Sequence, residues 1–169
     1  MNLFEYQGKR LYQDFSIPTP KSIFVSSISE ITDNHGLTYP VVVKAQVQVG
    51  GRGKAGGIKV AKDFDELTKF SDEILGMDIK GHIVQSLLLE EASDILEEYY
   101  ISFTLDRSAK SYLMMLSAKG GMDIEEVAEK NPDDLIMLHI SPSKGLDSET
   151  IIKSIEDAKL NESYKAELS

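Results

Sequence analysis

Residues 41–60, VVVKAQVQVGGRGKAGGIKV, constrain the fold more than any other part of the chain. The segment begins with continuous β-branched residues, which are typical of a buried strand. Glycines then alternate with cations through residues 50–57, and the apolar segment IKVA follows. This order predicts a strand, a glycine-rich loop and a returning strand that forms a hairpin-like unit with the first.

The loop has the residue types that suit a phosphate site. Glycines let backbone N–H groups approach phosphate oxygens, and Arg52 and Lys54 can neutralise their charge. Lys44 lies in the buried strand and needs a counter-charge, which either a phosphate or a nearby Asp or Glu could supply. The loop lacks the Walker A spacing, and it joins two strands and does not open a helix, so it is not a Rossmann fingerprint. A solvated glycine-rich turn is the alternative.

The charge distribution argues for a local anionic ligand and against larger anionic partners. The net charge is −10, yet residues 41–62 carry five cations and no acid. We therefore expect neither nucleic acid nor a membrane as a partner. The chain has no cysteine, which excludes disulfides, thiolate catalysis and Cys-ligated zinc. The N-terminal segment has no apolar signal core, and we expect a cytoplasmic location.

Periodicity along the rest of the chain predicts an α+β protein in which antiparallel strand pairs carry packed helices. A hairpin is expected from the turn-forming residues between the strands at 98–106 and 111–118. The expected helices cover residues 3–15, 27–36, 63–76, 123–131 and the tail from 148, and the expected strands cover 22–26, 40–47, 58–61, 82–91, 98–106, 111–118 and 135–140.

Four segments in this order resemble the β subunit of succinate–CoA ligase (succinyl-CoA synthetase, ADP- or GDP-forming): MNLFEYQGKRLY, VVVKAQVQVGGRGKAGGIKV, LLLEEASDILEEYYISFTLDRS and SAKGGMDIEEVAEKNPDDL. The resemblance implies an ATP-grasp fold, in which two lobes with antiparallel or mixed sheets close over a nucleotide. Residues 21–100 would form the first lobe, with the phosphate loop. Residues 1–20 and 101–169 would form part of the second. The C-terminal CoA-ligase domain is expected to be absent, so the chain is interpreted as an N-terminal fragment.

The resemblance also assigns ligands to particular residues. It implies ATP/ADP or GTP/GDP as the nucleotide, together with Mg²⁺ whose Asn and Asp ligands are expected beyond the end of this chain. No catalytic or metal-binding residue is assigned within it, and Gln48 stands where the family has a histidine. The implied nucleotide-binding residues are Lys44 at the phosphates, Gly51, Arg52 and Gly53 in the phosphate-covering loop, and Glu90, Ser93 and Glu98 at the base and ribose.

The implied function is a ligase that couples succinyl-CoA/succinate interconversion, a step of the tricarboxylic acid cycle, to ATP or GTP. A phosphohistidine on the α subunit, the implied partner, exchanges its phosphoryl group with the nucleotide. We expect this chain alone to be inactive. Two alternatives stay open: a fragment of a related malate– or citrate–CoA ligase, and a folded, non-catalytic fragment that only binds a partner. The base preference and the oligomeric state are open too.

Overall fold

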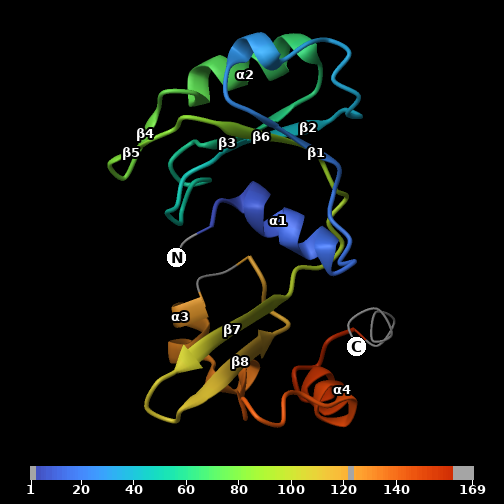
Figure 1. The fold of residues 1–169 in the computed structure, drawn as a ribbon, viewed down its shortest axis with the longest axis vertical. Coiled ribbons are helices and arrows are strands. Elements are labelled where there is room, and N and C mark those ends of the chain that lie inside the picture. Colours follow the sequence, from blue (N-terminus) through green and yellow to red (C-terminus); the bar gives the residue numbers. More distant parts are fainter. Residues whose placement is uncertain (1–2, 122–123, 162–169) are drawn as a thin grey trace. The chain divides into compact units, whose positions relative to one another are not determined.

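The computed structural model describes residues 3–121 and 124–161 and divides into two compact units, Met1–Asp94 and Ile95–Ser169 (Figure 1). Each unit contains an antiparallel sheet with helices, which confirms the α+β class. The sequence grouped residues 1–20 with the second lobe. In the structure the helix of this N-terminal segment belongs to the first unit, because Glu5 and Lys9 of the helix form ion pairs with Lys44 and Glu90 of that unit's sheet.

The sheet of the first unit is antiparallel throughout. The glycine-rich loop joins two adjacent strands, and the register places Lys44 opposite Ile58, so the predicted hairpin is confirmed. In spatial order the strands are β1 (Ser22–Val25), β6 (Leu87–Glu91), β2 (Val41–Ala45) and β3 (Ile58–Ala61).

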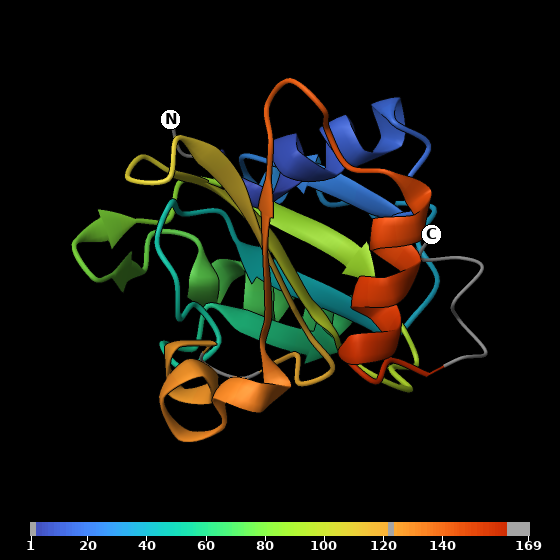
Figure 2. The same ribbon diagram turned by 90° about the horizontal axis from the view of Figure 1, so that it is seen from below.

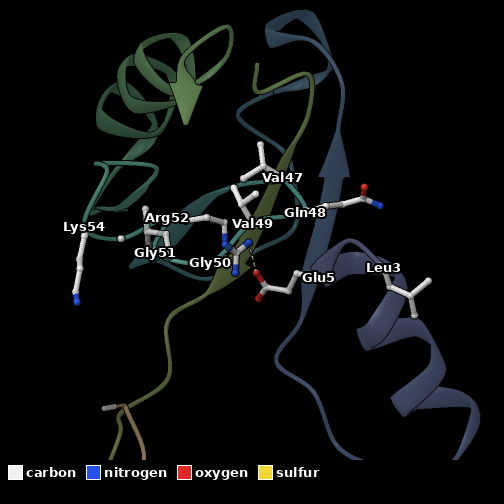
Figure 3. Close-up of a pocket in the computed structure, with 11 residues that line it drawn as sticks. Leu3, Glu5, Val47, Gln48, Val49, Gly50, Gly51, Arg52 and Lys54 are labelled. Atoms are coloured by element: carbon white, nitrogen blue, oxygen red, sulfur yellow. Dashed lines mark ion pairs between the residues drawn. The ribbon is translucent and has the colours of Figure 1, made fainter. Parts of the chain in front are cut away.

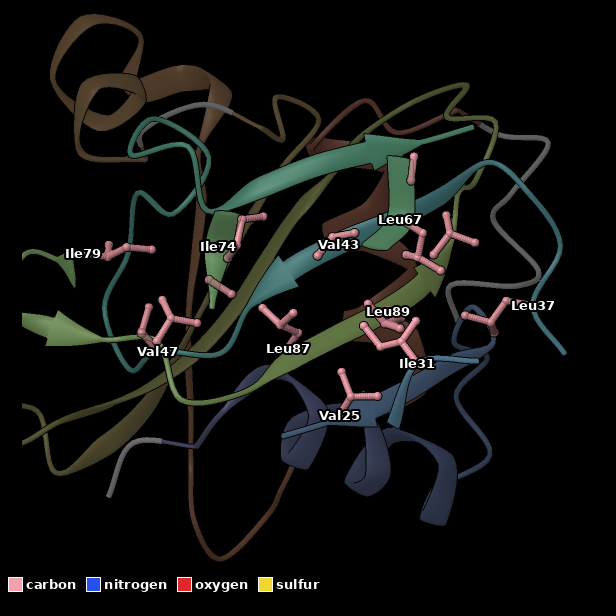
Figure 4. Packing of buried hydrophobic residues seen from close by; sticks show 14 residues of the cluster. Val25, Ile31, Leu37, Val43, Val47, Leu67, Ile74, Ile79, Leu87 and Leu89 are labelled. Atoms are coloured by element: carbon pink, nitrogen blue, oxygen red, sulfur yellow. The ribbon is translucent and has the colours of Figure 1, made fainter. Parts of the chain in front are cut away.

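One face of this sheet is apolar and forms the core (Figure 4). Alternate residues of β2 and β6, among them Val43 and Leu89, are almost completely buried there. Helix α2 (Phe64–Ile74) covers this face with Leu67, which is fully buried. The helix begins where the side chain of Asp63 accepts a hydrogen bond from the backbone of Glu66, an N-cap of the usual kind.

Helix α1 (Glu5–Asp14) lies on the opposite side of the sheet from α2 (Figure 1). Its Tyr6 ring packs on Phe24 of β1, with 4.3 Å between ring centroids, and the Tyr6 amide donates to the Gln46 side chain. At the start of the helix the Gln7 side chain accepts a hydrogen bond from the Phe4 amide at 3.0 Å. The 27–36 helix is only a single turn, η1 (Ile28–Glu30).

The predicted strand 82–91 is divided in two. Its first two residues form β5 (His82–Ile83), which pairs with the preceding β4 (Asp78–Ile79) in a small hairpin that is separate from the four-stranded sheet (Figure 2). Lys80 and Gly81 both have positive φ angles, as a two-residue turn of this kind requires. The chain then reaches β6, so only the last part of the expected strand joins the main sheet.

The second unit is a three-stranded antiparallel meander with helices. Its core includes Met114, Leu116, Ile140 and Ile155. Within residues 3–121 and 124–161, no helix has the length and apolar character needed to cross a membrane. The elements in chain order are β7 (Tyr100–Asp106), β8 (Ser111–Ser117), α3 (Ile124–Lys130), η2 (Pro132–Asp134), β9 (Ile136–Ile140) and α4 (Ser148–Asp157).

Replacing Leu67 by Ala should lower the free energy of unfolding of the first unit by about 3 kcal/mol, because it removes buried methyl groups and leaves a cavity under α2. Val60→Ala on β3 is the control, since that side chain is 52% exposed and should cost less than about 1 kcal/mol. Urea unfolding followed by circular dichroism measures both. Equal losses in the two variants would contradict this description of the core.

Candidate functional site

An open pocket of about 870 Å³ lies in the first unit beside the glycine-rich loop (Figure 3). The side chains of Arg52 and Glu5 point toward each other in it, whereas Lys54 points away from them. The pocket is therefore bounded by the cationic loop on one side and by the start of α1 on the other. The lining residues are Leu3, Glu5, Val47, Gln48, Val49, Gly50, Gly51, Arg52, Gly53, Lys54 and Ile58.

A cluster of three cations and two carboxylates lies at the pocket. Lys44 Nζ is 2.6 Å from Glu90 Oε1 and 3.1 Å from Glu5 Oε1. Arg52 Nη1 is 2.7 Å from Glu5 Oε2, and Lys9 forms an ion pair with the other oxygen of Glu90. The Glu90 side chain is 6% exposed and those of the other members 15–22%. Glu5 thus bridges the strand lysine and the loop arginine.

The pairing of the strands explains why Lys44 and Glu90 meet. Lys44 lies opposite Leu88 on β6, and Glu90 lies opposite Val42, so the two charged residues are diagonal neighbours. Side chains two residues apart on a strand share a face, and diagonal neighbours are within reach of long side chains. The charged residues therefore share the sheet face opposite the α2-covered core.

The cluster shifts the pKa values of its members. Burial raises the pKa of the Glu5 carboxyl, but the charges of Lys44 and Arg52 outweigh this effect and hold it below its usual value. Burial lowers the pKa of Lys44, but its hydrogen bond to Glu90 and the charges of both carboxylates raise it overall. Glu5 therefore stabilises the fold above its unfolded-state pKa, and this contribution is lost as the pH falls through the lower folded-state value.

The glycine-rich loop leaves backbone donors for a ligand. Its internal hydrogen bonds use the N–H groups of Ala55, Gly56 and Gly57. The N–H groups of residues 50–54 donate to no acceptor in the part of the chain that the structure describes. A concave row of unpaired N–H groups beside cations is typical of an anion site, so the geometry fits a phosphate.

The structure brings three of the predicted residues together in the cluster, Lys44, Arg52 and Glu90, and it places Gly51 and Gly53 in the adjoining loop. Ser93 is exposed beyond the end of β6. Glu98 belongs to the second unit, where its carbonyl accepts a hydrogen bond from the Gly120 amide. A side chain at Gly120 would lie only 2.5 Å from the Glu98 backbone, so glycine is required for this contact.

The structure shows which of the two expected kinds of counter-charge Lys44 has within the chain. The sequence left a phosphate and an acidic side chain open, and the structure supplies two acidic side chains. Glu5 and Lys9 were not expected in the site. Their i,i+4 spacing on a predicted helix, next to apolar residues, indicates one charged helix face, but only the tertiary fold shows what this face covers.

The comparisons with known proteins decide the family. A family model described as "ATP-grasp domain" matches residues 2–169. The chain belongs to the ATP-grasp domain family. This membership confirms the fold expected from the resemblance, and members of the family bind nucleotides, usually with Mg²⁺. The described residues contain no group of three His, Asp or Glu side chains that could hold a metal ion.

Curated relatives of this ATP-grasp domain confirm the resemblance to succinate–CoA ligase β subunits. The ADP-forming β subunit of Halobacterium salinarum is 44% identical over 170 aligned positions, which cover all of this chain and 44% of that protein. The corresponding subunit of Natronomonas pharaonis is 48% identical over 147 positions, covering 86% of this chain and 39% of that one. The chain thus spans less than half the length of these relatives.

Solved structures share the fold at lower identity. An acetyl-coenzyme A synthetase of Candidatus Korarchaeum cryptofilum, bound to coenzyme A and Ca-AMPCP, has a TM-score of 0.72 and 20% identity over 97% of this chain and 68% of that one. The ATP citrate lyase of Methanothrix soehngenii has a TM-score of 0.64 and 21% identity over 94% and 42% of the two chains. At these identities the comparison supports the fold alone.

Glu90→Gln should destabilise the first unit by about 2–4 kcal/mol, because it removes the nearer carboxylate from two partly buried ammonium groups, those of Lys44 and Lys9, and leaves Glu5 alone to neutralise them. Glu73→Gln is the matched control, since Glu73 pairs with Lys59 at the surface and such pairs contribute at most about 1 kcal/mol. Urea titration of both variants gives the difference. A loss in the Glu90 variant no larger than in the control would contradict a structural role for the buried pair.

Gly51→Ala should distort the phosphate loop. Gly51 has a φ of +81°, and an added Cβ would lie 3.2 Å from Nζ of Lys80. A residue with a side chain at such a φ costs about 1 kcal/mol, so we expect a small loss of stability and a larger loss of anion binding. Titration with inorganic triphosphate measures the anion binding. Gly50→Ala is the control, because Gly50 has no positive φ and the added Cβ would have no atom within 4 Å. Equal triphosphate affinity in both variants would contradict this geometry.

Proposed function

We propose that this chain is the nucleotide-binding part of a succinate–CoA ligase β subunit. The observation that carries the proposal is that Arg52 and the loop residues 50–54 line one pocket, and the N–H groups of these residues have no acceptor among the described residues. Lys44 is joined to Arg52 there through Glu5, which contacts both. The similarity to succinate–CoA ligase β subunits over the whole chain supports it independently.

Each group has a distinct task in this proposal. The N–H groups of residues 50–54 donate to phosphate oxygens, as in other glycine-rich phosphate loops. Lys44 and Arg52 neutralise phosphate charge, and Lys54 approaches from the exposed side of the loop. The resemblance assigns Glu90, Ser93 and Glu98 to the base and ribose, and Glu90 also forms ion pairs with Lys44 and Lys9. Bound Mg²⁺ would add further charge neutralisation at the phosphates.

The reaction proposed for the complete protein is phosphoryl transfer linked to CoA-thioester chemistry. A phosphohistidine on the α subunit loses its N–P bond as a terminal phosphate oxygen of ADP or GDP forms the new P–O bond, and the reverse step uses ATP or GTP. Such transfers depend on positioning and charge neutralisation more than on covalent protein chemistry. The loop and Lys44 would provide both. The α subunit is the proposed partner and the cytoplasm the proposed location.

A second candidate is a related acyl-CoA ligase that acts on another carboxylic acid. The structural likeness to an acetyl-coenzyme A synthetase and an ATP citrate lyase makes this the main alternative. Identity of 44–48% with succinate–CoA ligase β subunits, against 20–21% with those structures, favours succinate.

Calorimetric titration of the 169-residue chain with Mg-ADP and Mg-GDP tests the proposal. Lys44→Ala should weaken binding at least about tenfold, because one buried charge contact to phosphate is lost. Lys54→Ala, at an exposed loop position, should weaken it severalfold without affecting folding. Lys59→Ala is the control, since Lys59 pairs with Glu73 away from the pocket. The better ligand would define the base preference.

The outcomes separate clearly. Binding that falls in the Lys44 and Lys54 variants and persists in the Lys59 variant supports the phosphate site. Binding that is equal in all four proteins would contradict it, and so would failure of the folded wild-type chain to bind either nucleotide.

A further inference from the structure

The Glu5 carboxylate contacts both side chains that the proposed function assigns to phosphate. Its two oxygens lie 3.1 Å from Lys44 Nζ and 2.7 Å from Arg52 Nη1. These are the distances of charge-assisted contacts, which are the kind that a phosphate oxygen would make with the same groups. Glu5 also lines the pocket, so its carboxylate and an incoming phosphate would share one space.

The ion pair with Glu5 also fixes the position of the Arg52 side chain. Its Nη1 lies 2.9 Å from the carbonyl of Ala45 as well as 2.7 Å from Glu5. The guanidinium is thus fixed toward the end of β2, with its charge largely neutralised. Lys44 is neutralised twice, by Glu5 and by the more buried Glu90.

The two carboxylates of the cluster are not equivalent. Glu90 is 6% exposed and pairs with Lys44 and Lys9 inside the sheet-facing part of the cluster. Glu5 is 20% exposed, lies at the first turn of α1 and borders the pocket. Of the two, Glu5 is the more exposed carboxylate and the one that borders the pocket, so it is the one that an incoming phosphate would displace from its cations.

Helix α1 has attachments that do not involve Glu5. Lys9 pairs with Glu90, the Tyr6 amide donates to Gln46, and the Tyr6 ring packs on Phe24. Release of Glu5 would therefore break its ion pairs with Lys44 and Arg52 and still leave the helix attached to the sheet.

We propose that Glu5 competes with nucleotide phosphate for Lys44 and Arg52, and so sets the affinity and the phosphate-number preference of the site. This inference rests on the proposed function. Phosphate binding transfers the two cations from the Glu5 carboxylate to phosphate oxygens, and Glu90 continues to pair with Lys44. Phosphate then gains less binding free energy from Lys44 and Arg52 than it would from two unpaired cations, because the ion pairs with Glu5 must first be broken.

The test compares the wild-type chain with Glu5→Gln in titrations with adenosine, AMP, ADP and ATP in the presence of Mg²⁺. Glutamine keeps the size of the side chain and removes the charge. We expect affinity for ADP and ATP to rise about tenfold and affinity for adenosine to stay unchanged, because only phosphate competes with the carboxylate. A role of Glu5 that is only structural would change all four ligands alike.

Glu73→Gln is the matched control, since it makes the same change in net charge at an exposed pair in the same unit. It should alter no affinity. Glu5→Asp provides a second variant: it keeps the charge, but its shorter side chain cannot reach both cations, so ADP affinity should rise by less than in Glu5→Gln.

The outcomes distinguish the two proposals. ADP binding that depends on Lys44 but is unchanged or weakened in Glu5→Gln overturns competition by Glu5 and leaves the proposed function standing. Tighter binding of adenosine and ADP by the same factor also overturns it. No binding of any nucleotide by folded wild-type and variant chains overturns the proposed function itself.

Discussion

The ion pair between Lys44 and Glu90, which are diagonal neighbours on adjacent strands, is the interaction on which the charged face of the first unit's sheet depends. A lysine in a central strand is costly to bury without a counter-charge. The adjacent strand supplies one carboxylate and α1 supplies the second, so the helix is bound to the polar face of the sheet by charge as well as by the Tyr6–Phe24 contact. The apolar face is left to α2 and the core.

Lys44 and Arg52 belong both to the ion pairs that hold α1 on the sheet and to the candidate site. The cluster of three cations and two carboxylates carries a net charge of +1, and it adjoins loop residues 50–54, whose backbone N–H groups have no protein acceptor among the described residues. Glu90, the more buried carboxylate, pairs with Lys44 and Lys9 on the α1 side of the sheet, whereas Arg52 and Glu5 meet at the pocket. The proposed anion binding would use this second, more exposed side of the cluster.

Low sequence identity to solved structures supports the fold, whereas an argument about function needs the higher identity of the succinate–CoA ligase β subunits. Structures at about one-fifth identity share the fold with this chain, which is a statement about packing and topology. The succinate–CoA ligase β subunits are 44–48% identical over 147–170 positions, and this higher identity is what supports the proposed function.

The class of the fold, the hairpin around the glycine-rich loop, a helix at residues 63–76 and the position of Lys44 and Arg52 near that loop could be predicted from the sequence, because local periodicity and glycine content carry this information. The limits of η1 and the division of residues 82–91 could not, because turn geometry overrides strand-forming residues there. The carboxylates that neutralise Lys44 became known from the tertiary structure alone. Glu5 and Glu90 are 85 positions apart, and strand register together with the docking of α1 brings them to one ammonium group.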